Sequence, residues 1–178
     1  MRQDARGLTL LELLVAIAVM GVLLGVGVPS FKNLQRRMRA DTTFHVLTAS
    51  LTLARTTAVK NHSYVSVCPS SDGHRCRNDA VWQDGWIVFS DPHREDHPRS
   101  AAEILDRVGA IGDELTLQST AGRIRVRFTA DGWAYGSNLS IRLCSPEKSR
   151  MLGQVIVNNA GRPRTERYAS LKSCPHAP

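Results

Sequence analysis

The chain begins with one continuous apolar run. From Leu8 to Val28 the segment LTLLELLVAIAVMGVLLGVGV holds 21 residues and a single charge, that of Glu12. A helix rises about 1.5 Å per residue, so this run would span roughly 30 Å, the thickness of a bilayer's hydrocarbon core. The short stub before it carries two arginines. The positive-inside rule therefore places the stub in the cytoplasm and the chain after Pro29 on the exported side.

After Pro29 the apolar positions take a helical spacing. They recur every three or four residues and so predict one helical face. We expect one long helix over residues 8–60, kinked or interrupted near Pro29 and the glycines before it. The face consists of Phe44, Leu47, Leu51, Ala54 and Ala58, widened by Leu53 and Val59.

From Ser63 onward the period changes to two. The segments YVSVC, WIVFSD, RIRVRFTADG, LSIRLC and QVIVNNAG are short, rich in β-branched and aromatic residues, and separated by turn residues. Strands without alternating helices predict the α+β class, with one long helix packed on antiparallel sheet. The polar stretch 90–104 is expected to be a mobile loop.

Composition excludes several classes of protein. The chain has 178 residues, a mean hydropathy of −0.21 and a formal net charge of +7. It is too polar for a polytopic membrane protein and too apolar for a disordered one. The sequence contains no G-x-S-x-G, no glycine-rich phosphate loop and no H-E-x-x-H. We therefore expect neither enzymatic activity nor a cofactor, whereas the positive charge permits nucleic acid, an anionic membrane or an acidic partner.

Four cysteines are enough for two disulfides in an exported domain, where the environment is oxidising. Three pairings are possible. Cys68 and Cys76 flank the turn-rich segment PSSDGHR, which favours a bridge between them, and Cys144–Cys174 would then tie the C-terminal tail to a strand. A zinc site using Cys68, Cys76 and His74 is the alternative. Because no C-x-x-C pair is present, we expect no metal.

Glu12 is unusual because a carboxylate inside a membrane helix costs about 3 kcal/mol unless a partner meets it. It either reaches back to the interface or pairs with a charge in an assembly. The string RGLTLLE, followed by an apolar helix that meets Pro29, resembles the class III signal of type IV prepilins and type II secretion pseudopilins. This resemblance implies cleavage by a prepilin peptidase after Gly7, methylation of the new terminal Leu8, and a role for Glu12 in subunit registration. Most members carry Phe where this chain has Leu8.

The order of motifs along the rest of the chain resembles the FimT/GspH branch of minor pilins. The motifs are LARTTAVKNHSYVSVCP, DGWIVFSD, RFTADGWAYGS, IRLC and VIVNNAGRPR. The resemblance implies a type IV pilin-like fold, an inner-membrane precursor with a periplasmic domain, and later assembly into a surface pilus with other major and minor pilins. We divide the chain into a leader (1–7), a membrane and filament-core helix (8–28), an amphipathic continuation (29–60) and an exported β-rich domain with a basic C-terminal arm (61–178).

The last 32 residues hold six Lys or Arg and two acidic residues, so four of the seven net positive charges lie there. Pro163 disfavours helix at Arg162, and residues two apart in an extended chain lie roughly 7 Å apart. The guanidiniums of Arg162 and Arg164 therefore suit neighbouring phosphates. The candidate DNA-contacting residues are Lys148, Arg150, Gly161, Arg162, Arg164, Arg167 and Lys172.

Arg123, Arg125 and Arg127 form a second basic candidate. Strand alternation would put all three on one face, with Ile124, Val126 and Phe128 turned inward. A solvated strand face is the ordinary interpretation of such a pattern, and DNA contact is the alternative.

The pattern Gly161-Arg162-Pro163-Arg164 resembles the GRxR of FimT-type pilins associated with DNA uptake during natural transformation. The resemblance implies a minor pilin that binds DNA without sequence preference. Since no aromatic residue is interleaved in the motif, phosphate contacts should dominate, and affinity should be weak and salt-sensitive. Gly161-Arg162 could instead merely shape a turn. Two alternatives are therefore kept: a structural, assembly-initiating minor pilin, and a minor pseudopilin of a type II secretion system.

Overall fold

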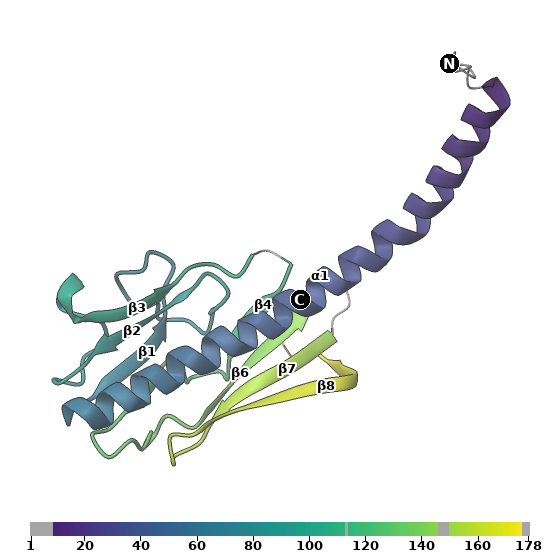
Figure 1. Cartoon of the computed structure of the whole chain (residues 1–178). Coiled ribbons are helices and arrows are strands. Elements are labelled where there is room, and N and C mark those ends of the chain that lie inside the picture. Colours follow the sequence, from purple (N-terminus) through teal and green to yellow (C-terminus); the bar gives the residue numbers. More distant parts are fainter. Residues whose placement is uncertain (1–8, 113, 146–149, 176–178) are drawn as a thin grey trace. The chain divides into compact units, whose positions relative to one another are not determined.

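One helix accounts for the N-terminal third of the chain. The computed structural model describes residues 9–112, 114–145 and 150–175, and in it α1 runs from Leu10 to Asn61 (Figure 1). The helix passes through Pro29 without a break. Of the two expected alternatives, an interruption near Pro29 is therefore wrong, while a kink there stays a prediction. The chain divides into two compact units, residues 1–39 and residues 40–178.

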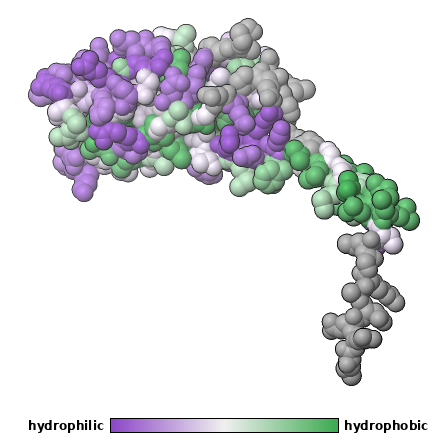
Figure 2. Space-filling view, turned by 90° about the horizontal axis from the view of Figure 1, so that it is seen from above, coloured by the Kyte–Doolittle hydropathy of each residue, from purple (hydrophilic) through white to green (hydrophobic). Residues whose placement is uncertain are grey.

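The first unit carries the apolar run. Its side chains between Leu10 and Val28 are exposed, and the helix is long and apolar enough to cross a membrane. Figure 2 shows this part of α1 as a green, hydrophobic surface. In water such a surface would be costly, whereas a bilayer or neighbouring apolar helices would cover it.

The second unit contains two four-stranded antiparallel sheets (Figure 1). The first has the order β3-β2-β1-β5 and the second the order β4-β6-β7-β8. A short 3-10 turn, η1 (Ala101–Glu103), precedes β3. The strands are β1 (Val65–Pro69), β2 (Trp86–Ser90), β3 (Ile104–Val108), β4 (Thr116–Ser119), β5 (Val126–Phe128), β6 (Leu139–Ser145), β7 (Arg150–Val157) and β8 (Pro163–Ser173).

The inner face of α1 joins both sheets in one core. Its five predicted positions are at most 2% exposed and pack with buried residues of both sheets. The expected α+β class is therefore confirmed. Leu53 and Val59 are 39% and 43% exposed, so the buried stripe is narrower than the sequence predicts. The buried positions are Phe44, Leu47, Leu51, Ala54 and Ala58.

Two disulfides close the chain at separate places. Cys68 is bonded to Cys76 and Cys144 to Cys174, with Cα atoms 5.5 Å and 6.0 Å apart. The second bond ties the end of β8 to β6, so the C-terminal segment is a paired strand rather than a loose arm. Because both cysteines of the zinc alternative lie in a disulfide, neither offers a thiolate to a metal.

The segment 90–104 is anchored rather than loose, contrary to the sequence-based expectation. Asp91 is 2% exposed, and its carboxylate accepts hydrogen bonds from Ser66 at 2.6 Å and from Arg127 at 2.7 Å. Its backbone N–H donates to the Tyr64 carbonyl at 2.8 Å. A buried carboxylate with these partners fixes the start of the loop against β1 and β5.

The core assignment predicts a difference between two leucines of α1. Leu47→Ala should lower the free energy of unfolding by about 2–5 kcal/mol, because it removes a fully buried side chain. Leu53→Ala, on the exposed side of the same helix, should change it by about 0.5 kcal/mol or less. Urea titration of the full chain in uncharged detergent micelles, followed by circular dichroism, measures both. Equal losses would contradict the assignment of the inner face.

Candidate nucleic-acid interface

The arginine motif lies at the turn between β7 and β8. Val157 pairs with Pro163 at the end of the ladder, so residues 158–162 form the connection. The Gly161 N–H donates to the Asn158 carbonyl at 2.9 Å, which closes the turn. Gly161 has a φ of +69°, a conformation that favours glycine. The motif is therefore presented by an ordered hairpin.

A second loop contacts this turn through its backbone. Residues 129–138, which connect β5 to β6, are called the aromatic loop here because they contain Trp133 and Tyr135. The Ala134 N–H donates to the Asn159 carbonyl at 2.8 Å. A Cβ on Gly161 would lie only 2.1 Å from the Gly132 carbonyl oxygen, so the two backbones touch. Arg55 of α1 donates to that same oxygen at 3.0 Å.

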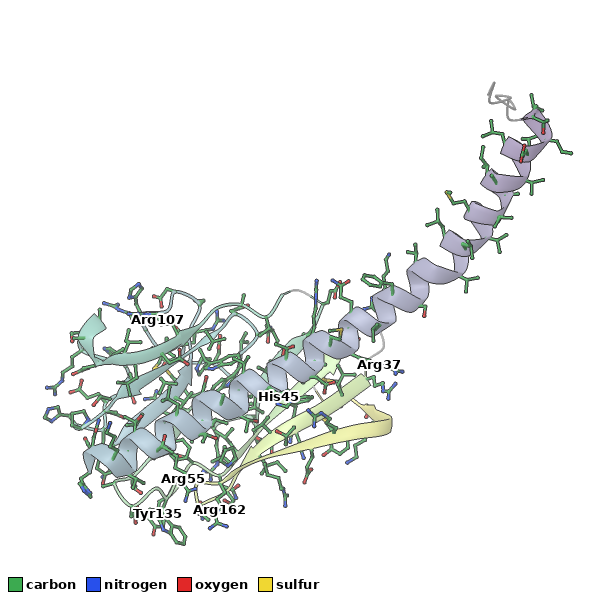
Figure 3. The ribbon with its side chains drawn as sticks, viewed as in Figure 1. Arg37, His45, Arg55, Arg107, Tyr135 and Arg162 are labelled. Atoms are coloured by element: carbon green, nitrogen blue, oxygen red, sulfur yellow. A yellow bond between two sulfur atoms is a disulfide. The ribbon has the colours of Figure 1, made fainter. Side chains whose placement is uncertain are left out.

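Figure 3 shows the result, with Arg55, Tyr135 and Arg162 gathered at one end of the sheets. Arg162 is exposed. The Arg164 side chain is 70% exposed and forms an ion pair with Glu166 at 2.9 Å. Both arginines are thus exposed, but Arg164 already has an acidic neighbour.

Glu166 belongs to a small polar network on the second sheet. It accepts hydrogen bonds from Gln154 and from the Tyr168 hydroxyl, each at 2.9 Å. These two bonds, followed by the charges of Arg164 and Lys172, hold the pKa of Glu166 below its ordinary value. The carboxylate is therefore ionised at neutral pH and offsets part of the positive charge of the hairpin.

The other residues predicted to contact DNA lie on different parts of the second sheet or outside the described residues. Arg167 forms an ion pair with Asp41 at 2.8 Å and lies over the Phe44 ring at 5.7 Å, so it fastens β8 to α1. Lys172 is exposed, with its ammonium 4.0 Å from the centre of the Tyr168 ring. Arg150 is half-buried at the start of β7, and Lys148 lies outside the described residues. Arg162 and Arg164 are both exposed, whereas Arg167 has a structural role.

The second basic candidate does not form a solvated strand face. Arg127 is 21% exposed and bonds to Asp91 at 2.7 Å and to the Glu95 carbonyl at 2.6 Å. Arg125 is paired with Asp96, and Arg123 donates to the Gly136 carbonyl. Arg123 and Arg125 also precede β5, which contains only three residues. The loop 90–104 supplies the acidic and carbonyl partners that the strand pattern alone does not reveal.

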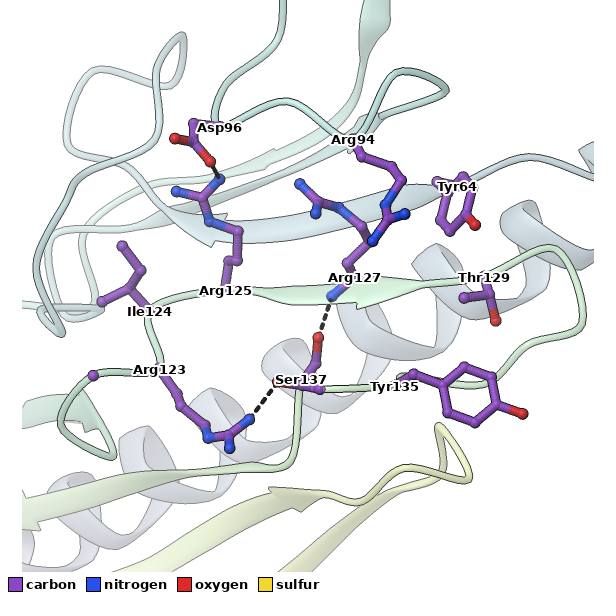
Figure 4. A pocket seen from close by; sticks show the side chains of 12 residues that line it. Tyr64, Arg94, Asp96, Arg123, Ile124, Arg125, Arg127, Thr129, Tyr135 and Ser137 are labelled. Carbon is purple, nitrogen blue, oxygen red and sulfur yellow. Dashed lines mark hydrogen bonds and ion pairs between the residues drawn. The ribbon is translucent and has the colours of Figure 1, made fainter.

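A polar pocket of about 620 Å³ lies between this arginine group and the aromatic loop (Figure 4). Arg94, whose guanidinium lies 5.5 Å from the centre of the Tyr64 ring, lines it together with Arg123 and Tyr135. Sequence reasoning missed Arg94 and Tyr135. The spacing Trp-Ala-Tyr in the glycine-flanked segment DGWAYG was the available signal, because alternation turns both rings to one side.

The processing residues lie at the other end of the chain. Gly7 and Leu8 fall outside the described residues. Glu12 is exposed in the first turn of α1, where its backbone N–H donates to the Thr9 hydroxyl at 3.3 Å. A threonine hydroxyl in that position caps the start of a helix.

The family model described as type II transport protein GspH matches residues 45–161, more than half of the chain. The chain belongs to this GspH family. A second model, the prokaryotic N-terminal methylation motif, matches residues 2–28. The chain is thus a minor type IV pilin or a type II secretion pseudopilin, a structural protein rather than an enzyme. The methylation motif implies processing by a prepilin peptidase and assembly with other pilins.

Two solved structures resemble the fold of this GspH-family protein. The minor pilin FimU of Pseudomonas aeruginosa has 18% identity and a TM-score of 0.59, over 79% of this chain and 98% of that one. The minor pseudopilin EpsH of Vibrio cholerae has 9% identity and a TM-score of 0.52, over 74% and 99%. No curated protein matches the chain in sequence. The family match ends at Gly161, so Arg162 and Arg164 lie just beyond it.

The contact between the aromatic loop and the hairpin predicts that Gly161→Ala lowers the stability of the fold more than Gly122→Ala does. Both glycines have positive φ, 69° and 75°, so both variants pay the left-handed penalty of about 1–2 kcal/mol. Only at Gly161 would the new Cβ collide with backbone, while Gly122 has nothing within 4 Å. Thermal unfolding of the full chain should show the larger drop in Tm for Gly161→Ala. Equal drops would mean that the hairpin does not depend on the aromatic loop.

Proposed function

We propose that this minor pilin binds DNA without sequence preference through Arg162 and Arg164, and that it serves DNA uptake. The observation that carries the proposal is the exposure of Arg162 in the turn and of Arg164 at the start of β8, on a hairpin that the rest of the fold holds in place. Arginine presents a planar set of donors that matches phosphate oxygens, and a fixed turn reduces the ordering cost of binding.

These two arginines differ from three other arginines described above. Arg125, Arg127 and Arg167 each have a carboxylate partner from a distant segment of the chain. Among the described residues, no ion pair or hydrogen bond involves the Arg162 guanidinium, and the acid beside Arg164 lies on the same strand. The lack of such a fastening role supports the proposal that the motif contacts a ligand.

Phosphate contact explains the absence of sequence preference. Arginines on a turn can reach the DNA backbone, whereas reading base edges in a groove requires an inserted element with several fixed side chains. The exposed Asn158 and Asn159 add amide donors beside the motif. Binding of this kind is weak and decreases steeply as salt rises.

We also propose how the subunit reaches its place. The peptidase would cut after Gly7, and methylation would follow at Leu8. Helix residues 8–28 would anchor the chain in the inner membrane, with residues 61–178 in the periplasm, until the subunit enters a pilus. Glu12 would there meet the new terminal amine of a neighbouring subunit, which removes the cost of an unpaired carboxylate.

Replacing both arginines tests the DNA site. Arg162→Gln with Arg164→Gln should weaken binding to duplex DNA at least tenfold at low salt. It should also reduce the slope of log K against log salt by about 2, since two phosphate contacts are lost. Fluorescence anisotropy of labelled DNA, titrated with the full chain in uncharged detergent micelles at two salt concentrations, measures both quantities.

The matched control removes two exposed positive charges elsewhere. Arg75→Gln with Arg107→Gln changes the net charge equally on another part of the surface and should change affinity by about twofold or less. If both double variants weaken binding to the same extent, the site is not at the hairpin. If the unmodified chain does not bind DNA at low salt, the DNA proposal fails and a structural minor pilin or pseudopilin is the function.

Glu166 gives a test in the opposite direction. Glu166→Gln removes the carboxylate beside Arg164 and should raise DNA affinity by about two- to fivefold at neutral pH, measured by the same anisotropy titration. Because the pKa of Glu166 is lowered, the carboxylate stays ionised at pH values at which an ordinary glutamate would already be protonated. The difference between variant and original should therefore persist at pH 5 and close only under more acidic conditions. Unchanged affinity at neutral pH would show that phosphate does not meet Arg164.

A further inference from the structure

We propose that the aromatic loop stacks unpaired DNA bases on Trp133 and Tyr135, so that the site prefers single-stranded over duplex DNA. This inference rests on the DNA binding proposed above and identifies the form of DNA that the site takes. It departs from the expectation that phosphate contacts dominate, which rested on the absence of an aromatic residue within the arginine motif, because Trp133 and Tyr135 belong to a loop that contacts the hairpin in the folded chain.

The two rings form an exposed, ordered pair. Their centroids are 5.3 Å apart and their planes differ by 7°, so they are stacked. Trp133 is 42% and Tyr135 58% exposed. Large aromatic side chains are ordinarily buried. Among the described residues of the second unit, Trp133 and Tyr135 are the two that are exposed. A flat aromatic surface open to solvent can accept a further flat ring.

The loop holds the pair in position before any ligand arrives. Ala134, between the two aromatic residues, is fully buried, so its neighbours on either side point outward. The Thr129 N–H donates to the Trp133 carbonyl and the Gly132 N–H to the Thr129 carbonyl, each at 2.8 Å. The bond from Ala134 to Asn159 then fixes the loop to the hairpin. Binding would therefore order little that is not already ordered.

Positive charge flanks the pair on two sides. On one side the hairpin contact through Gly132 and Gly161 brings Arg162 close (Figure 3). On the other side Tyr135 lines the pocket that Arg94 and Arg123 also line (Figure 4). A single strand crossing the loop could place phosphates near both groups and its bases on the rings, which is the arrangement that unspecific single-strand binding uses.

Asp131 makes the loop itself a poor place for phosphate. Its carboxylate accepts a hydrogen bond from the Thr129 hydroxyl, which is the main reason that its pKa is lowered. It therefore carries a negative charge at neutral pH, beside the Trp133 backbone. The Asp131 carboxylate repels phosphates but not the uncharged bases. A base is therefore favoured over a phosphate on the aromatic loop, and the phosphates are favoured beside the arginines on either side.

Duplex DNA should gain little from the pair. Its bases are already stacked on one another and only its ends expose a base face, whereas a single strand offers each base in turn. Stacking of one base on an aromatic side chain corresponds to about fivefold to a hundredfold in affinity. This range sets the size of the effect to measure.

Trp133 provides its own signal. The chain has three tryptophans, and Trp82 and Trp86 are 0% and 1% exposed, so a ligand at the surface can reach only Trp133. The full chain in uncharged detergent micelles is titrated with a 12-nucleotide oligothymidine, with an abasic strand of the same length, and with a duplex whose ends are closed by linkers. We expect the oligothymidine to quench Trp133 fluorescence and to bind at least fivefold more tightly than the abasic strand.

Variants separate stacking from structure, with affinities measured by anisotropy. Trp133→Leu, and independently Tyr135→Leu, should weaken oligothymidine binding about fivefold or more and leave abasic and duplex binding within about twofold. Tyr135→Phe keeps the ring and should retain oligothymidine affinity. Each variant is compared with the original chain by circular dichroism.

Each result bears on one of the two proposals. If oligothymidine and abasic strand bind equally well, base stacking is wrong and phosphate binding stands. If Trp133→Leu and Tyr135→Leu weaken both strands equally, the loop acts only by positioning Arg162, and stacking is again wrong. If no nucleic acid binds at low salt, the DNA site itself is wrong and this inference falls with it.

Discussion

The inner face of α1 is shared by two sheets, and the position of every surface described above depends on it. Phe44, Leu47 and Leu51 lie in one core with residues from both sheets. Hydrogen bonds beside this apolar contact fix how each sheet is oriented on the helix. Ser50 donates to Asp106 of β3 at 3.3 Å, and the hydroxyls of Thr48 and Thr165 of β8 lie 3.0 Å apart. Because β3 and β8 are the outer strands of different sheets, one helix fixes both. The hairpin that carries the arginines is thus placed by residues more than a hundred positions earlier in the chain.

The sequence predicted the parts of the fold that follow local periodicity. The buried positions of α1 recur with the helical repeat, β1 and β2 are short and largely apolar, and β6 and β7 alternate between more and less buried positions. The pattern did not reveal β3, β4 or β8. Thr116–Ser119 is only four residues long, and Pro163–Ser173 contains six charged or polar residues between Arg164 and Lys172. Strand β8 exists because it pairs with β7 on both sides of a register shift between Met151 and Gly153 and because the bond to Cys144 holds its end, both of which are non-local causes.

In the candidate site too, local sequence features predicted some residues, and contacts formed only in the folded chain decide the role of others. Arg162 and Arg164 were predicted because Pro163 and the spacing of two are local features. Arg125 and Arg127 looked equivalent in the sequence, but their guanidiniums meet Asp96 and Asp91, which lie about thirty residues earlier. No strand pattern contains that information, because the loop 90–104 reaches β5 only in the folded chain. The same reason hid the position of the aromatic pair beside the arginine motif: Trp133 and Arg162 are separated in sequence, and the contact of Gly132 with Gly161 brings their loops together.

This contact also separates the two explanations of the motif Gly161-Arg162. Gly161 has a positive φ and no room for a Cβ, so the turn itself accounts for the glycine. The match to the GspH family ends at that residue. Arg162, the next residue, is exposed, and the geometry of the turn does not require an arginine there. A structural hairpin therefore explains the glycine, and contact with DNA phosphates is the explanation proposed here for the two arginines.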